Sequence, residues 1–176
     1  LWHLIQPIIT SFVFLIIFNK FAGISTQGIP GLLFYLIGNI SWAFFSTSLS
    51  NIGMTLVNNA EIYKKVFFPR IVLPISNIFV SYIRFFFQIL LFCSVYMYFF
   101  FNGFNFNINT SIIFFPFFII HLSVFTFSLG LIVASVTIKY RDLRFALQFG
   151  LQMLMFATPV IYSFESVPER FKYFAY

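Results

Sequence analysis

The sequence predicts an all-α protein, a polytopic bundle of transmembrane helices. Of its 176 residues, 61% are hydrophobic and 8% are charged, whereas a soluble domain is about 45–50% apolar. The apolar residues also gather in runs, and several runs approach the roughly 20 residues that a helix needs to cross the hydrocarbon core. A water-soluble fold could not bury so many Phe, Leu and Ile side chains. The bilayer must therefore be the solvent for much of the chain.

Five apolar segments account for the predicted spans. They cover residues 4–18, 32–52, 71–101, 112–138 and 145–164. A cleaved signal peptide is the alternative for the first segment, but no cleavage site of the A-x-A kind follows it. The chain starts without an initiator Met and stops soon after the fifth segment. We therefore expect residues 1–176 to form one transmembrane domain that is truncated at both ends.

The positions of lysine and arginine predict how the spans are oriented, because cytoplasmic loops carry an excess of both. If the N-terminus is cytoplasmic, the inside loops hold Lys64, Lys65, Arg70, Lys139, Arg141 and Arg144, and the outside loops hold Lys20, Arg170 and Lys172. The same distribution explains the net charge of +6 without nucleic acid, because the basic residues lie between membrane-length segments and not on one folded face. We expect a multi-pass protein with its N-terminus in the cytoplasm.

The stretch "NNAEIYKKVFFPR", residues 58–70, contains the first charged cluster. Its surroundings predict a short amphipathic helix over 56–68 at the inner membrane surface. One face of this helix would hold Leu56, Ala60, Tyr63 and Phe67. Glu61 and Lys65 would form an i,i+4 pair, and Pro69 would stop the helix. Periodicity alone equally allows a charged interfacial turn with no further role.

The second charged cluster is "KYRDLR", residues 139–144, a polar turn between two long apolar segments. Asp142 lies beside Arg141 and Arg144, which makes it a poor catalytic acid, and it is suited to cap the helix that follows. No His, Asp, Glu or Cys residues have metal-ligand spacing, and Cys93 is the single cysteine. We therefore predict no metal site and no catalytic residues.

With these residues the chain resembles the permease subunit of polysaccharide-exporting ABC transporters, the family of O-antigen, capsule and teichoic acid exporters. The resemblance runs through nearly all 176 residues in four linked motifs. They are "LWHLIQP", "GIPGLLFYLIGNISWAFFSTSLSNIGMTLVNNA", "IYKKVFFPRIVLPIS" and "VTIKYRDLRFALQFGLQMLMFATPVIYSFESVP". Gly31 and Gln148 depart from the pattern, where an aromatic or proline and a proline are expected, so kinking of the second and fifth spans is left open.

The resemblance implies a six-span domain, five spans of which lie in residues 1–176. It also implies that the first cytoplasmic loop is a coupling helix that docks into a separate nucleotide-binding ATPase subunit. The implied coupling residues are Glu61, Tyr63, Lys64, Lys65, Pro69 and Arg70, with Lys139, Arg141, Asp142 and Arg144 in the second turn. This chain has no GxxxxGK[ST] phosphate loop. We therefore expect no cofactor on it, and ATP and Mg on the partner subunit.

The resemblance further implies that two permease copies form a homodimer with the transport path at their interface. The residues expected to line the path are Trp42, Phe45, Ser46, Ser48 and Tyr162. Aromatic faces suit sugar C–H groups, although packing against lipid is the alternative for each aromatic residue. Pro159 would leave a backbone carbonyl unpaired near the outer end of the fifth span. We expect a gate there, with a kink that does not gate as the alternative.

The cargo implied by the resemblance is a lipid-linked polysaccharide that crosses the bacterial cytoplasmic (inner) membrane, with membrane lipids around the protein. Two other functions remain possible at this point. An ABC permease for drugs or lipids would share the helical plan and the separate ATPase. A membrane-embedded glycan-handling enzyme would need acidic or metal-binding residues in a loop, and the sequence offers none.

Overall fold

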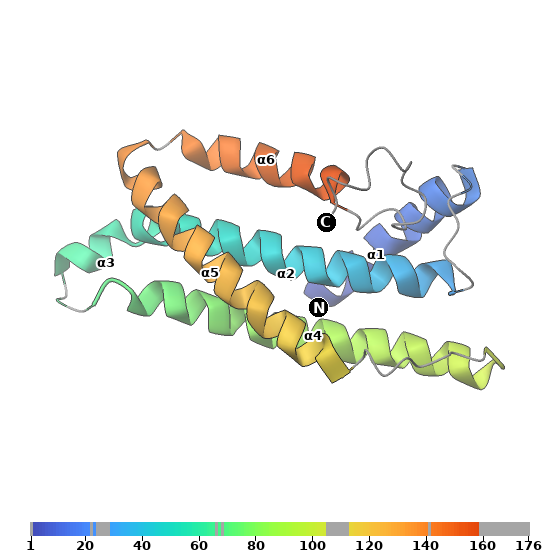
Figure 1. Ribbon diagram of the computed structural model, residues 1–176. Coiled ribbons are helices and arrows are strands. Elements are labelled where there is room, and N and C mark those ends of the chain that lie inside the picture. The colour runs from blue at the N-terminus through green and yellow to red at the C-terminus, as the bar shows by residue number, and fades with distance from the viewer. Residues whose placement is uncertain are drawn as a thin grey trace. The chain divides into compact units, whose positions relative to one another are not determined.

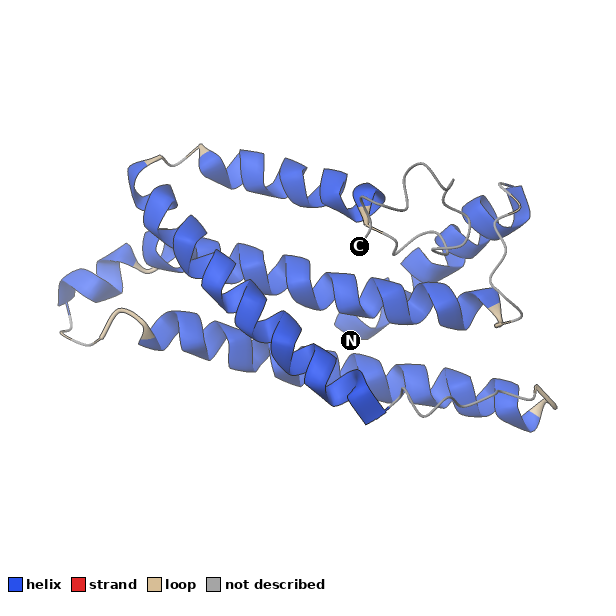
Figure 2. Cartoon of the chain, in the orientation of Figure 1, coloured by secondary structure: helices blue, strands red, loops and turns tan. Residues whose placement is uncertain are grey.

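The structure is a computed structural model that describes residues 2–21, 23, 29–65, 67, 69–104, 113–140 and 142–158. Within these residues all regular structure is helical, which confirms the predicted fold class (Figures 1 and 2). The elements are α1 (Trp2–Phe14), the π-helix η1 (Leu15–Phe21), α2 (Gly31–Asn58), α3 (Ala60–Lys65), α4 (Val72–Phe101), α5 (Phe115–Lys139) and α6 (Leu143–Ala157).

Three of these helices, α2, α4 and α5, are long and apolar enough to cross a membrane, and shorter apolar helices cover Ile5–Asn19 and Leu143–Ala157. Their ends differ from the predicted spans. The second span was predicted to end at residue 52, but α2 continues to Asn58 because Gly53, Met54 and Thr55 are buried. The predicted fifth span reaches residue 164, and its part beyond residue 158 lies outside the described residues.

The chain divides into two compact units. Unit 1 contains Leu1–Trp42, Phe86–Phe106 and Met153–Tyr176, and unit 2 contains Ala43–Phe85 and Asn107–Gln152. In unit 1 the first helix is fastened to α2 by a buried amide, because Asn39 Nδ2 donates a hydrogen bond to the carbonyl O of Pro7 at 3.3 Å. The same carbonyl accepts a bond from Ser11 Oγ at 2.6 Å. Phe14 packs edge-on against the fully buried Tyr35, with ring centroids 6.4 Å apart.

In unit 2, the buried face of α5 consists mostly of small side chains, and most of the large side chains of α5 are exposed. The buried residues of α5 are Ile119, Ser123, Thr126, Gly130, Ala134 and Thr137. They recur every three or four residues and so form one face. The hydroxyls of Thr126 and Thr137 donate to the carbonyls of Leu122 and Val133 on the same helix, each at 2.6 Å. The hydroxyl groups of these two threonines therefore have their partners within α5 itself. This face can then pack closely against a neighbouring helix.

Two glycines let α2 and α5 approach each other in unit 2. A Cβ atom on Gly130 would lie 2.6 Å from Cγ2 of Ile52, and one on Gly53 would lie 2.7 Å from Cγ1 of Val133. Each glycine therefore receives the β-branched side chain of the opposite helix. Small residues at helix interfaces are typical of membrane proteins, where close packing holds the helices together.

We predict that Gly130→Ala destabilises the protein by about 1–3 kcal/mol, the usual cost of overpacking a core. Ile52 is fully buried and cannot move aside without disturbing its neighbours. The change would be measured as a lower midpoint of thermal unfolding in detergent. Gly150→Ala is the matched control, because a Cβ atom on Gly150 would meet nothing within 4 Å. Equal midpoints for the two variants would contradict the close contact.

Candidate functional site

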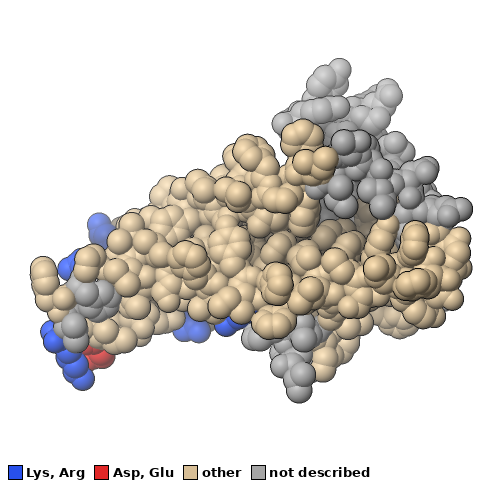
Figure 3. Space-filling model, turned by 90° about the horizontal axis from the view of Figure 1, so that it is seen from below, with Lys and Arg blue, Asp and Glu red and all other residues tan. Residues whose placement is uncertain are grey.

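Of the charged side chains of unit 2 that the structure describes, all except Arg84, in the middle of α4, gather at one end of the unit. Helix α3, which joins α2 to α4, and the turn between α5 and α6 both lie there (Figure 1). Figure 3 shows lysine and arginine side chains clustered at this end. The exposed charged residues of the two segments are Glu61, Lys64, Lys65, Arg70, Lys139, Asp142 and Arg144. The two clusters that the sequence assigns to one side of the membrane therefore share one end of unit 2.

The segment over 56–68 is not the single helix that we expected. Helix α2 ends at Asn58, Asn59 forms a turn, and α3 follows. The backbone N and the side-chain Nδ2 of Asn59 both donate to the carbonyl O of Thr55, at 3.1 and 2.8 Å. Asparagine side chains compete for backbone groups in this way, which makes them poor residues inside a helix. Asn59 therefore breaks the helix and lets α3 leave in a new direction.

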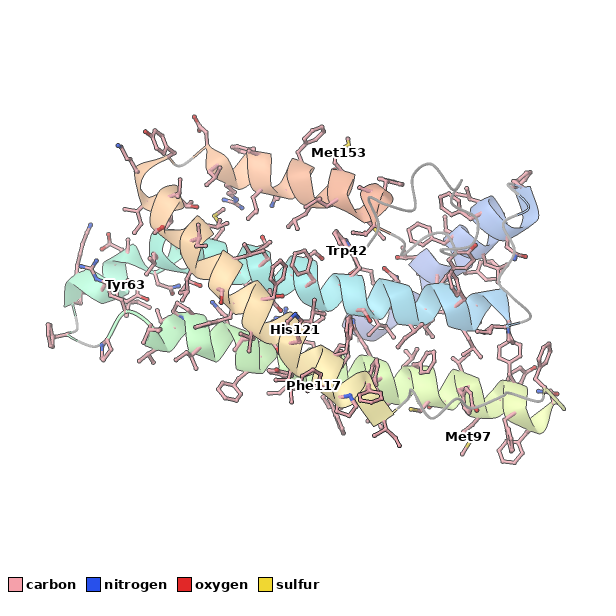
Figure 4. All side chains as sticks on the ribbon, in the orientation of Figure 1. Trp42, Tyr63, Met97, Phe117, His121 and Met153 are labelled. Atoms are coloured by element: carbon pink, nitrogen blue, oxygen red, sulfur yellow. The ribbon has the colours of Figure 1, made fainter. Side chains whose placement is uncertain are left out.

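Tyr63 fastens α3 to the segment that leads into α4 (Figure 4). Its hydroxyl donates a hydrogen bond to the carbonyl O of Arg70 at 3.0 Å. Partial burial raises the pKa of the Tyr63 phenol above its usual value, and the nearby Arg70 guanidinium opposes this effect by lowering the pKa. The phenol therefore keeps its proton at neutral pH and remains a donor.

Helix α3 carries an exposed ion pair, and two further exposed cations, Lys65 at its end and Arg70 in the segment that follows, lie near it. Lys64 Nζ lies 3.2 Å from Oε1 of Glu61, three residues earlier. The expected partner of Glu61 was Lys65, one position further along. Helix α3 contains both lysines, and the pair that forms is the i,i+3 pair with Lys64. Among the described residues, neither Lys65 nor Arg70 forms an ion pair, and both are exposed.

The turn between α5 and α6 holds the second charged cluster. The backbone N of Tyr140 donates to the carbonyl O of Val136 and closes α5, and the Lys139 ammonium lies 5.3 Å from the centroid of the Tyr140 ring. Asp142 directly precedes α6, where a capping residue belongs, and its carbonyl O accepts a bond from Phe145 N at 3.1 Å. Arg141 lies outside the described residues. A capping role for the Asp142 side chain stays a prediction.

The residues expected to line a path are packed to different degrees. Trp42 and Ser46 are half-buried. The ring of Phe45 stacks on Phe125 of α5, with centroids 6.3 Å apart and planes at 18°. Ser48 is fully buried, and its hydroxyl has no hydrogen-bond partner among the described residues. Tyr162 and the predicted gate residue Pro159 lie outside the described part of the chain.

Sequence reasoning missed a polar stripe on α6. Arg144, Gln148 and Gln152 are all exposed and follow one another at four-residue spacing, which places them on one side of the helix. The rest of the exposed surface of α6 is apolar and includes Phe145, Phe149 and others. The spacing is visible in the sequence, where it could have been noticed. In the described residues, no three His, Cys, Asp or Glu side chains come together as they would around a metal ion.

Comparison with known proteins gives one family for the whole chain. Residues 1–176 match the family described as ABC-2 type transporter. Two proteins of Klebsiella pneumoniae are 26% identical to the chain over 176 and 174 residues, covering 98% of this chain and 64% of each relative. A protein of Myxococcus xanthus is 25% identical over 171 residues, covering 97% of this chain and 63% of its own length. All three are named O-antigen export system permease protein RfbA.

We predict that Tyr63→Phe loosens α3 without unfolding the protein. The variant keeps the ring and loses one hydrogen bond, which contributes about 1 kcal/mol net. Backbone amides of α3 should then exchange with deuterium about fivefold faster, as expected for that free energy. Tyr140→Phe is the control, because Tyr140 is an exposed tyrosine of the same unit. Unchanged exchange in α3 would show that the bond to Arg70 does not hold the helix.

Proposed function

Because the chain belongs to the ABC-2 type transporter family, we propose that it forms the membrane-spanning part of an ABC transporter that exports lipid-linked polysaccharide across the bacterial cytoplasmic membrane. The family match along all 176 residues carries this proposal. The three relatives support the choice of cargo, since each is named as an O-antigen export permease. The chain spans just under two thirds of their length. Function and partners of the whole protein are therefore part of the proposal.

The proposed energy source is a separate ATPase subunit that binds ATP and Mg. The sequence supports this division of labour, because none of its lysines is followed by Ser or Thr as a GxxxxGK[ST] loop requires. The subunit would dock at the charged end of unit 2, where α3 and the α5–α6 turn expose several cations. Such a surface attracts an acidic patch on a partner, which steers association and fixes the orientation of docking.

The proposed path is a hydrated route between two copies of the permease. A polysaccharide is long and polar, so its path needs side chains that bind sugars weakly and repeatedly. Trp42, Phe45, Ser46 and Ser48 remain candidates, with Tyr162 at the outer end and Pro159 as the gate. To these we add Gln148 and Gln152, because exposed amides on a helix that crosses a membrane are costly unless water, protein or cargo meets them. Their amide groups can both donate to and accept from sugar hydroxyls.

We predict that Lys65→Glu combined with Arg70→Glu weakens binding of the ATPase subunit by about tenfold or more, because like charges brought together at an interface cost several kcal/mol. The measurement is the amount of ATPase that co-purifies with the tagged, full-length permease in mild detergent. Lys20→Glu combined with Arg170→Glu is the control, since it makes the same charge change at two positions predicted to lie outside. Equal recovery from all three proteins would contradict docking at α3. A folded wild-type permease that recovers no ATPase would contradict the proposed function.

We also predict that Gln148→Leu combined with Gln152→Leu lowers polysaccharide export by about tenfold, because up to two hydrogen bonds of about 1 kcal/mol each are lost along the path. Export would be measured as polysaccharide at the cell surface, at equal permease abundance. Phe149→Leu is the control on the exposed apolar side of the same helix. Full export by the double variant would show that Gln148 and Gln152 do not line the path.

A further inference from the structure

Thr55, in the last turn of α2, forms hydrogen bonds both to α4 and to Asn59, the residue that links α2 to α3. Its carbonyl O accepts from the Nδ2 of Asn59, the residue between α2 and α3, at 2.8 Å. Its hydroxyl Oγ1 accepts from the Nδ2 of Asn77, in the second turn of α4, at 2.6 Å. A single buried residue, 1% exposed, therefore connects its own helix to α4 and to the residue that precedes α3.

In the hydrogen bonds among Asn51, Thr55 and Asn77, the direction of one bond fixes the direction of the next. The single hydroxyl hydrogen of Thr55 is directed to the carbonyl O of Asn51 at 2.6 Å. The Thr55 oxygen can then only accept, so Asn77 must present its NH₂ group. That group also lies 3.4 Å from the same Asn51 carbonyl. Ser81 Oγ donates to the carbonyl O of Asn77 at 3.0 Å and continues the polar contact along α4.

The described residues between Thr55 and Asn77 form a corner that contains α3. On the side of the corner next to α4, the Tyr63 hydroxyl bonds to the carbonyl O of Arg70, and the Val72 amide donates to the carbonyl O of Pro69 at 3.1 Å. Pro74, near the start of α4, is fully buried. Helix α3 has only six residues, too few to be stable alone. Its position is therefore set by the corner that holds it.

We propose that the Asn77–Thr55 hydrogen bond is a clamp that makes α2 and α4 move together when α3 is displaced. The inference rests on the proposed function, in which α3 receives the motion of an ATPase subunit. Asn77 and Thr55 are positioning residues in this scheme and contact neither the cargo nor ATP. Without the clamp, a push on α3 would shift the end of one helix against the other. ATP would then be hydrolysed with less export.

If the Asn77–Thr55 bond only stabilised the fold, its loss would not change the amount of ATP used per exported chain. The following variants distinguish this stabilising role from the proposed role in transmitting motion. Asn77→Leu alone would leave a threonine oxygen without its partner, and this variant can fail to fold. Thr55→Val with Asn77→Leu replaces both partners by apolar groups of similar shape, which is nearly neutral for stability. The control is Tyr82→Phe, which removes the hydroxyl that contacts Ser123 of α5. It breaks another contact between helices of unit 2, away from α3.

The test uses the full-length permease with its ATPase subunit in proteoliposomes, and deuterium exchange of the permease alone. For the double variant we expect exchange of α3 amides to rise at least threefold and ATP hydrolysed per exported chain to rise at least threefold. Tyr82→Phe should leave both values unchanged. Unchanged α3 exchange in the double variant would overturn the clamp. Faster exchange with an unchanged ATP-to-export ratio would overturn its role in transmission.

The same experiment separates failure of this inference from failure of the proposed function. If the wild-type protein neither binds an ATPase nor exports polysaccharide, the proposed function is wrong. Deuterium exchange of α3 is measured on the permease alone and still decides whether the clamp holds the corner. If the wild-type complex transports normally and the double variant keeps both its α3 exchange and its ATP-to-export ratio, the clamp alone is wrong.

Discussion

The structure depends on a constraint that lipid places on helix association. Hydrocarbon tails are as apolar as leucine, so burying apolar side chains between helices gains little free energy in a membrane. Helices must then be held by close packing and by polar contacts. Unit 2 uses both, since Gly53 and Gly130 allow α2 and α5 to meet and Asn77 bonds to Thr55 between α4 and α2. In unit 1, Asn39 does the same for α1 and α2.

This constraint explains why many large apolar residues of α4 and α5 lie outside. On α4 the exposed residues include Phe79, Ile83 and Phe87, while Ser81 and Gln88 are buried. On α5 the exposed residues include Phe117 and Phe118, and the buried face is made of small and hydroxyl-bearing residues apart from Ile119. Hydroxyls on such a face bond to their own helix and present no unpaired group to the neighbour. Small size and polarity therefore mark much of the inner faces of α4 and α5, whereas α2 buries large apolar residues such as Leu36, Ile40 and Phe44.

The fold class and the approximate helices could be predicted from the sequence because they depend on the length and composition of apolar runs. Helix ends could not be predicted as well. The end of α2 depends on burial of Gly53 to Thr55 and on the competition of Asn59 for a backbone carbonyl, and neither is visible in average hydropathy. Among the site residues, the charged clusters were readable from the sequence. The Thr55–Asn77 contact was not, because its partners lie far apart in the chain and meet only after packing.

Helix α4 is longer than the membrane that it crosses. Its 30 residues give a length of about 45 Å at 1.5 Å per residue, against a hydrocarbon thickness of about 30 Å. Tilting by the average of about 20° shortens the vertical span only slightly. Its exposed apolar residues nevertheless run from Val72 to Phe101. Part of this apolar surface must therefore lie beyond the average hydrocarbon thickness. Either the surrounding bilayer thickens locally to cover it, or another surface shields it from water.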